Sequence, residues 1–200
     1  MAITLNGTAG VTFPAGGLGN PAGAVVGTTD TQTLTNKTIQ GGATNSGTAQ
    51  ASTSGTSIDF TSIPSWVKRI TVMLSGVSTN GSGAIWLQTG AGSIVTTGYS
   101  SMSLTGNSGA AAAGNSTSSA ILVNLTGSAT STIYGTFVLT LLNSAANLWV
   151  ANGATADTTN TRTTSTQGGI TLSGALDRVR ITTSTGTDTF DAGSINILYE

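Results

Sequence analysis

Residues 66–75 read WVKRITVMLS, and the spacing of apolar side chains in this stretch decides the fold class. Four apolar side chains fall on even-numbered positions and share one face of an extended chain: Trp66, Ile70, Val72 and Leu74. A period of two is typical of a β-strand with one buried face. The stretch therefore predicts a half-buried strand, with Trp66 in the core.

The same alternation continues outward from this stretch, over residues 55–200. It predicts three more long strands, over residues 132–142, 177–184 and 194–200. It also predicts shorter ones, over residues 84–89, 119–125, 147–152 and 169–173. Strands with one apolar face each are buried when two antiparallel sheets pack face to face. We therefore expect an all-β chain whose residues 55–200 form an antiparallel β-sandwich, jelly-roll-like.

The composition agrees with an all-β fold. Thr is abundant and favours strands, whereas Glu occurs once and Lys twice. The one run with helical propensity, residues 110–113, is bounded by Gly109 and Gly114. The chain has no Cys and no His, which excludes disulfides, thiolate metal sites and a His general base. We expect neither a cofactor nor a metal.

Charge and hydropathy narrow the range of partners. Only 6% of the residues are charged and the net charge is −1, so we expect no nucleic-acid partner. No stretch approaches the ~20 apolar residues of a membrane span, and we expect no membrane insertion. Residues 1–14 lack the basic and apolar regions of a secretion signal. Synthesis in a cytoplasm is the expectation.

Two zones precede the expected sandwich. Residues 1–27 are rich in Gly and Pro, and we expect an extended attachment arm there. Residues 28–54 contain TTDTQTLTNKTI, at 28–39, followed by a polar linker. The apolar side chains of the Thr-rich segment are limited to Leu34 and Ile39. Because an isolated hairpin of this kind is marginal in water, we expect it to pair with copies of itself.

Residues 28–39 resemble the TDTQTLTNKTI-type segment found in bacteriophage tail fibres. Two further stretches are similar to the C-terminal domain of phage tail-fibre-like proteins, SGTSIDFTSIPSWVKRITVMLSGVSTNGSGAIWLQTG at 54–90 and LDRVRITTSTGTDTFDAGSINILYE at 176–200. This resemblance implies a virion structural protein, typically a homotrimer, whose distal domain often touches the host surface. It makes Leu34, Asn36 and Ile39 part of the expected trimerisation segment.

The expected function follows from these zones. The arm would attach the protein to other virion proteins of the tail, neck or capsid, residues 28–54 would join three chains, and the sandwich would contact a host surface glycan or protein. The protein would be assembled in the cytoplasm of the host bacterium and reside in the virion. The alternative is a capsid decoration or cement protein that stabilises the head. A depolymerase spike is a third hypothesis, which we favour least.

Four side chains are candidates for surface contacts. Trp86 and Trp149 each lie between two aliphatic residues that we expect to point inward, so we expect both indoles to face outward, toward an oligomer seam or a sugar ring. Arg178 and Arg180 share one strand face beside Asp177. They could hold an anionic glycan by bidentate contacts, but we favour structural ion pairs on a solvated sheet or between protomers.

The sequence contains few side chains that could carry out catalysis. Neither Lys37 nor Lys68 has an evident Ser partner, so we do not expect a Ser–Lys pair. A glycosidase needs two carboxylates that face each other across a sugar, and Asp188 and Asp191 are close in TGTDTFDAG. That context is a turn, where Asp more often accepts hydrogen bonds from the backbone. We therefore expect turn capping and no enzymatic activity.

Overall fold

The computed structural model describes residues 4–6, 10–12, 44–125 and 128–200. The chain divides into two units, residues 1–41 and residues 42–200. The described residues of the first unit form an antiparallel pair of strands, β1 (Thr4–Asn6) and β2 (Gly10–Thr12). The expected trimerisation residues Leu34, Asn36 and Ile39 lie outside the described residues, as does most of the attachment arm.

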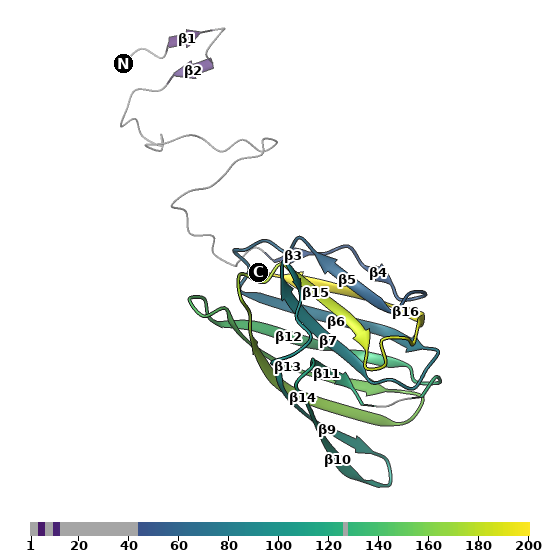
Figure 1. The fold of residues 1–200 in the computed structure, drawn as a ribbon. Helices are drawn as coiled ribbons and strands as arrows, with labels where there is room; N and C mark the ends of the chain where they lie inside the picture. The colour runs from purple at the N-terminus through teal and green to yellow at the C-terminus, as the bar shows by residue number, and fades with distance from the viewer. Residues whose placement is uncertain (1–3, 7–9, 13–43, 126–127) are drawn as a thin grey trace. The chain divides into compact units, whose positions relative to one another are not determined.

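The second unit is built from two antiparallel sheets that pack face to face (Figure 1). The large sheet has the order β10 (Ala110–Thr117), β9 (Ser100–Asn107), β14 (Arg162–Thr171), β13 (Leu148–Asp157), β12 (Ile133–Asn143), β6 (Arg69–Thr79), β16 (Phe190–Tyr199) and β3 (Asn45–Ser46), with β4 (Gln50–Ala51) also paired to β16. The small sheet has the order β11 (Ile121–Asn124), β7 (Ile85–Ala91), β15 (Arg178–Thr183) and β5 (Ser57–Thr61), with β8 (Ser93–Ile94) paired to β7. The expected all-β antiparallel sandwich is confirmed.

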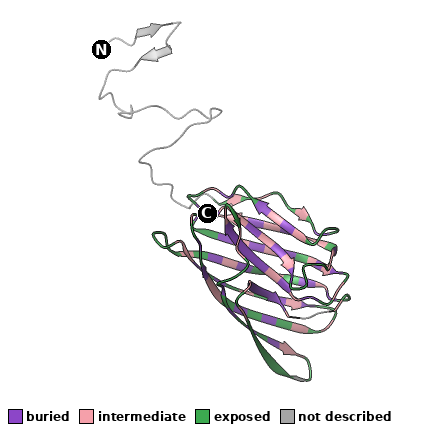
Figure 2. Cartoon of the chain, viewed as in Figure 1, coloured by how far each residue is buried: buried purple, intermediate pink, exposed green. Residues whose placement is uncertain are grey.

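Alternating side chains from both sheets form one hydrophobic core (Figure 2). In β6, the side chains of Ile70, Val72 and Leu74 point inward and are almost completely buried. Leu87 of β7 and Ile181 of β15 approach this layer from the small sheet, and both are fully buried. Among the described residues, no helix is long and apolar enough to cross a membrane.

The interior changes from apolar to hydroxyl-rich toward β9 and β14. The inward positions of these two strands carry Ser and Thr, all nine-tenths or more buried: Ser101, Ser103, Thr105, Thr164 and Thr166. The hydroxyl groups of Thr105 and Thr164 lie 2.9 Å apart, and Ser101 Oγ accepts the N–H of Leu122 at 3.2 Å. Hydrogen bonds therefore replace part of the apolar contact in this half of the sandwich.

The alternation pattern placed the start of the sandwich at Gly55. In the structure the sandwich begins earlier, with β3 and β4. The backbone N–H of Gly47 donates to the carbonyl of Ile197 at 2.8 Å, and that of Ser52 donates to Gly193 at 3.0 Å. Ser52 is fully buried, and its hydroxyl donates to the carbonyl of Ala192 at 2.8 Å. Residues expected in the linker thus cover part of the β16 edge, through two-residue strands too short to show alternation.

Candidate functional site

The outward face of the small sheet carries three of the predicted site residues. Arg178 and Arg180 alternate along β15 with buried side chains, so both guanidinium groups leave the sheet on its outer side. The antiparallel register sets Trp86 opposite Thr182 and Gln88 opposite Arg180. Trp86 is half-buried, as expected for an outward indole, and lies on the arginine face, one register step from Arg180.

Both arginines are engaged in ion pairs within the chain. Arg180 donates to Asp59 of β5 from Nε at 2.6 Å and from Nη2 at 2.8 Å. Arg178 donates to Asp177 in the same way, at 2.7 and 3.0 Å. The hydrogen bonds from Arg178 lower the pKa of the Asp177 carboxyl, and those to Asp59 raise the pKa of Arg180. An anionic ligand would have to displace these carboxylates, so the geometry agrees with the structural ion pairs that we favoured.

Trp149 does not face outward, and that expectation is wrong. Its side chain is only 2% exposed and belongs to the core, whereas the next residue, Val150, is 39% exposed. In β13 the inward positions are Trp149, Ala151 and Thr155. Alternation of apolar residues misleads here because three of them, residues 148–150, are adjacent in sequence.

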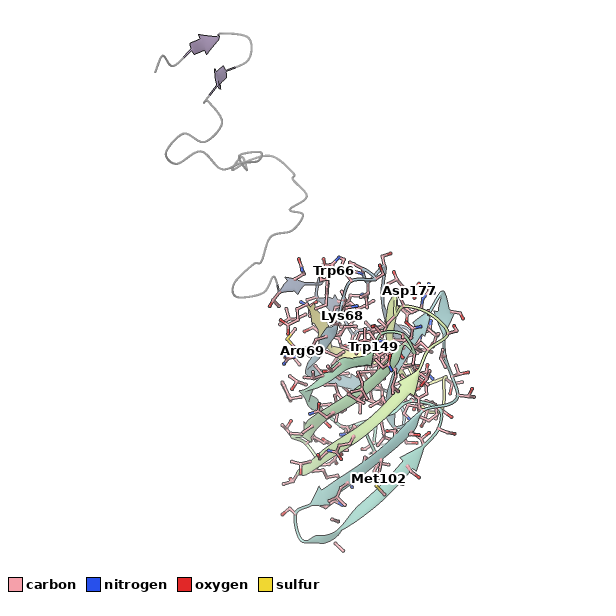
Figure 3. All side chains as sticks on the ribbon, turned by 90° about the vertical axis from the view of Figure 1, so that its left-hand side faces the viewer. Trp66, Lys68, Arg69, Met102, Trp149 and Asp177 are labelled. Atoms are coloured by element: carbon pink, nitrogen blue, oxygen red, sulfur yellow. The ribbon has the colours of Figure 1, made fainter. Side chains whose placement is uncertain are left out.

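Trp66 is the reverse case, because it was expected in the core and lies at the surface. Its side chain is 52% exposed and lies at the end of the sandwich (Figure 3). It packs against Tyr199, with ring centroids 5.9 Å apart. Residues 65 and 66 form a turn, closed by a hydrogen bond from the N–H of Val67 to the carbonyl of Pro64 at 3.1 Å. Strand β6 begins only at Arg69, so the alternation does not extend back to Trp66.

The outward positions of β9, β14, β13 and β12 form a sheet face without charged side chains. We use the name neutral face for a set of outward side chains on β9, β14, β13 and β12. Apart from one tyrosine, none of them is ionisable. They are Met102, Leu104, Thr163, Ser165, Gln167, Val150, Asn152, Ala154, Tyr134, Thr136, Val138 and Thr140. Four of them are large and exposed, namely Met102 at 65%, Leu104 at 55%, Tyr134 at 45% and Val150. Sequence reasoning missed this face because apolar residues at alternate positions normally indicate the buried side.

An open depression lies on the neutral face, between β9 and β13. Its lining includes Met102, Val150 and Gln167, together with hydroxyl groups from both strands of the β9–β10 hairpin. Gly168 and Gly169 leave the sheet without side chains at this point. A Cβ atom on Gly169 would lie 2.9 Å from the carbonyl oxygen of Trp149, so a larger residue would clash. Hydroxyls, one amide and two apolar side chains suit an uncharged partner.

The acidic residues weighed for catalysis have structural contacts or stand alone at the surface. Asp188 Oδ2 accepts the N–H of Gly83 at 2.6 Å, so this carboxylate joins the loop before β16 to the loop before β7 and does not cap its own turn through this contact. Asp191 is exposed. Over the described ranges, no three His, Cys, Asp or Glu side chains cluster in a way that could hold a metal ion.

Asp157 is the one carboxylate that is fully buried within the described ranges. Its oxygens accept hydrogen bonds from the hydroxyl of Ser131 at 2.8 Å, the amide of Asn160 at 2.8 Å and the N–H groups of Asn160 and Thr132. Burial acts to raise the pKa of Asp157, but these hydrogen bonds outweigh it and the pKa is lowered. The saturated carboxylate joins the β13–β14 turn to the start of β12 and serves the fold.

Comparison with known proteins adds no relative, since no family model, curated protein or solved structure matches this chain at a significant level. The site assignment therefore depends on geometry alone. Two outer faces emerge, one bearing Trp86 beside neutralised arginines and one neutral and partly apolar.

Proposed function

We propose that this chain is a structural protein of a bacteriophage particle, which forms a homotrimeric fibre on the tail or head and binds a host surface through its β-sandwich. The tail-fibre-like segment at residues 28–39 supports the virion assignment. The N-terminal arm attaches the protein to other virion proteins, and the mature protein resides in the virion. The protein acts by binding and carries out no catalytic step.

The neutral face is the observation that supports a binding role. Exposed side chains as large as Met102, Leu104 and Tyr134 are unusual on a sheet face that only meets water. Met102 and Leu104 lie two residues apart on β9, and Tyr134 lies on β12, beyond β14 and β13. Hydroxyl and amide groups between them offer hydrogen bonds to a glycan or a protein surface. Such contacts are individually weak, and three copies on one fibre strengthen them through effective concentration.

Competition for adsorption tests this proposal. The purified full chain should reduce adsorption of the phage to its host bacterium. The variant Thr136→Lys/Thr140→Lys places two charges on the neutral face at exposed positions and should lose most of this competition. The matched variant Ser57→Lys/Thr61→Lys adds the same charges to the outer face of the small sheet and should compete like the natural chain. Equal loss in both variants, or no competition at all, would contradict the proposal.

The same preparations test the alternative, a capsid decoration protein. Such a protein should bind emptied phage heads and raise the temperature at which they open, without an effect on adsorption. A depolymerase, the third hypothesis, should release reducing sugar from host polysaccharide, and Asp188→Ala or Asp191→Ala should abolish that release. Either result would replace the fibre proposal.

A further inference from the structure

Strand β10 leaves one edge of the large sheet open. It pairs only with β9 among the strands that the structure describes, so the backbone N–H and C=O groups along its other edge face solvent. Its residues from Ala111 to Ser116 are all exposed, and the hairpin reaches the end of the sheet in Figure 2. An edge of this kind is a template for pairing with another strand.

The usual protections of an edge strand are missing from β10. Residues 110–117 read AAAAGNST, without a charge or a proline. An irregularity between Ala110 and Ala113 disturbs the tip of the hairpin, but residues 113–117 pair with β9 in unbroken register. Five regularly paired residues therefore present an unguarded edge.

The other terminal strands of the two sheets are short or covered. On the small sheet, Gln50 donates from Nε2 to the carbonyl of Asp59 at 2.7 Å and so covers the edge of β5. At the opposite edge of that sheet, β11 has four residues and all of them are buried. On the large sheet, β3 and β4 have two residues each. The open edge of β10 is thus a local feature and not a general property of this sandwich.

We infer that the β10 edge pairs antiparallel with the β10 edge of a second copy of this chain, so that the two large sheets become continuous. Antiparallel pairing of identical strands is isologous, because each copy offers the same groups to the other. In this pairing a residue faces its own copy only at the two-fold axis, and residues on either side of the axis face each other. Because residues 113–117 are all small and uncharged, such pairs meet without steric or like-charge repulsion.

The neighbouring strand is compatible with this choice of partner. Gly114 and Ser116 lie opposite Leu104 and Met102 of β9, so these positions share the neutral face. When two hairpins join edge to edge, two β10 strands separate Met102 and Leu104 from their counterparts, by three strand spacings of about 4.8 Å each. The junction itself then holds only small, uncharged side chains, and the two neutral faces become one uncharged surface.

This pairing goes beyond the proposed fibre and does not depend on it. Two-fold pairing through β10 joins chains in twos, whereas the proposed trimerisation involves residues 28–54. If both hold, β10 links one trimer to another. If trimerisation fails, β10 still makes dimers, so the two proposals can fail separately.

The mass of the full chain in solution, measured by sedimentation over a range of concentrations, tests the inference. The mass of the natural chain should double as its concentration rises. The basic unit that doubles is the trimer if residues 28–54 trimerise, and the single chain if they do not. Gly114→Lys/Ser116→Lys should abolish the doubling, because lysines would meet their counterparts across the two-fold axis. A Cβ atom at Gly114 comes no closer than 3.9 Å to other residues, so this variant should keep the fold. The neutral-face variant Thr136→Lys/Thr140→Lys should double like the natural chain.

Cysteine cross-linking gives a second readout that does not depend on affinity. The chain contains no Cys, so any disulfide formed by a single engineered cysteine must join two copies. In antiparallel strands, opposite Cα atoms are about 4.5–5.5 Å apart, which is within the range of a disulfide. At least one of Gly114→Cys, Asn115→Cys and Ser116→Cys should give a rapid covalent dimer, and Thr61→Cys at the β5 edge should not.

Three results would overturn the inference. The first is a basic unit that never doubles at high concentration. The second is doubling that survives Gly114→Lys/Ser116→Lys but is lost in the neutral-face variant. The third is cross-linking that is no faster in the β10 variants than in Thr61→Cys.

Discussion

At the scale of single residues, buried hydroxyl groups make different contributions to stability according to their partners. Thr166 is completely buried, and its hydroxyl has no hydrogen-bond partner among the described residues. Burial of an unpaired hydroxyl costs about 1–3 kcal/mol. Thr166→Val keeps the side-chain shape and removes this group, so we expect the free energy of unfolding in urea to rise by about 1 kcal/mol.

Thr164 provides the matched control, on the same strand and the same face. Its hydroxyl lies 2.9 Å from that of Thr105, so Thr164→Val leaves the Thr105 hydroxyl without this buried partner. We expect Thr164→Val to lower the free energy of unfolding by about 1–2 kcal/mol. Changes of the same sign in Thr166→Val and Thr164→Val would show that hydrogen bonding does not decide stability here.

Asp157 gives the sandwich a dependence on pH. The folded-state pKa is lowered, so the stability from the ionised carboxylate is complete above the unfolded-state value of about 3.9 and is lost as pH falls through the folded-state pKa. Asp157→Asn should cost about 1–3 kcal/mol at pH 7, with a difference that shrinks below about pH 4. Urea unfolding at several pH values measures this. Asp191→Asn, at an exposed position, is the control and should leave the free energy of unfolding at pH 7 unchanged.

The tryptophans show how far single positions can be predicted from the sequence. Trp86 was predicted to face outward, and its register opposite Thr182 places it on the outer side of the small sheet, although residues 85–87 are also three adjacent apolar residues. Trp149 and Trp66 were both placed on the wrong side. The run of three apolar residues around Trp149 fits either register, and the turn before β6 that carries Trp66 to the surface has no signal stronger than Pro64.

At the scale of elements, strands β3 and β4 should be needed for full stability. A chain that begins at Thr44 keeps them, whereas a chain that begins at Gly55 loses the hydrogen bonds from Gly47 and Ser52 to the backbone around β16. At about 1 kcal/mol for each bond, the shorter chain should melt roughly 4–8 °C lower. Scanning calorimetry of both chains measures the difference. Equal melting temperatures would show that β3 and β4 add no stability and that the stable domain begins at Gly55.

The long strands with an apolar inner face were predicted, whereas the short β5, with buried Ile58 and Phe60, and the hydroxyl-lined β9 were not. The four long predicted runs correspond to β6, β12, β15 and β16, with ends displaced by a few residues. Strand β9 was missed because its buried positions are Ser and Thr while its apolar residues face outward. Residues 110–113, the one run with helical propensity, belong to β10, since pairing with β9 outweighs the weak preference of alanine.

At the scale of the whole molecule, the two outer faces differ in how binding should respond to salt. Contacts of the neutral face involve no charged side chain, whereas contacts through Arg178 and Arg180 would weaken as ions screen the guanidinium groups. We expect competition for host adsorption to change less than about two-fold between roughly 0.05 and 0.5 M NaCl, where the Debye length falls several-fold.

The arginine variants separate the two faces further. Arg178→Gln/Arg180→Gln removes both ion pairs from the small sheet but leaves the neutral face intact, so adsorption should be unchanged even if the melting temperature falls slightly. Trp86→Ala should likewise have little effect, because the indole lies on the arginine face. If adsorption instead falls steeply with salt and is lost in these variants, the small sheet is the binding surface. The exposed apolar side chains of the large sheet would then serve assembly of the particle.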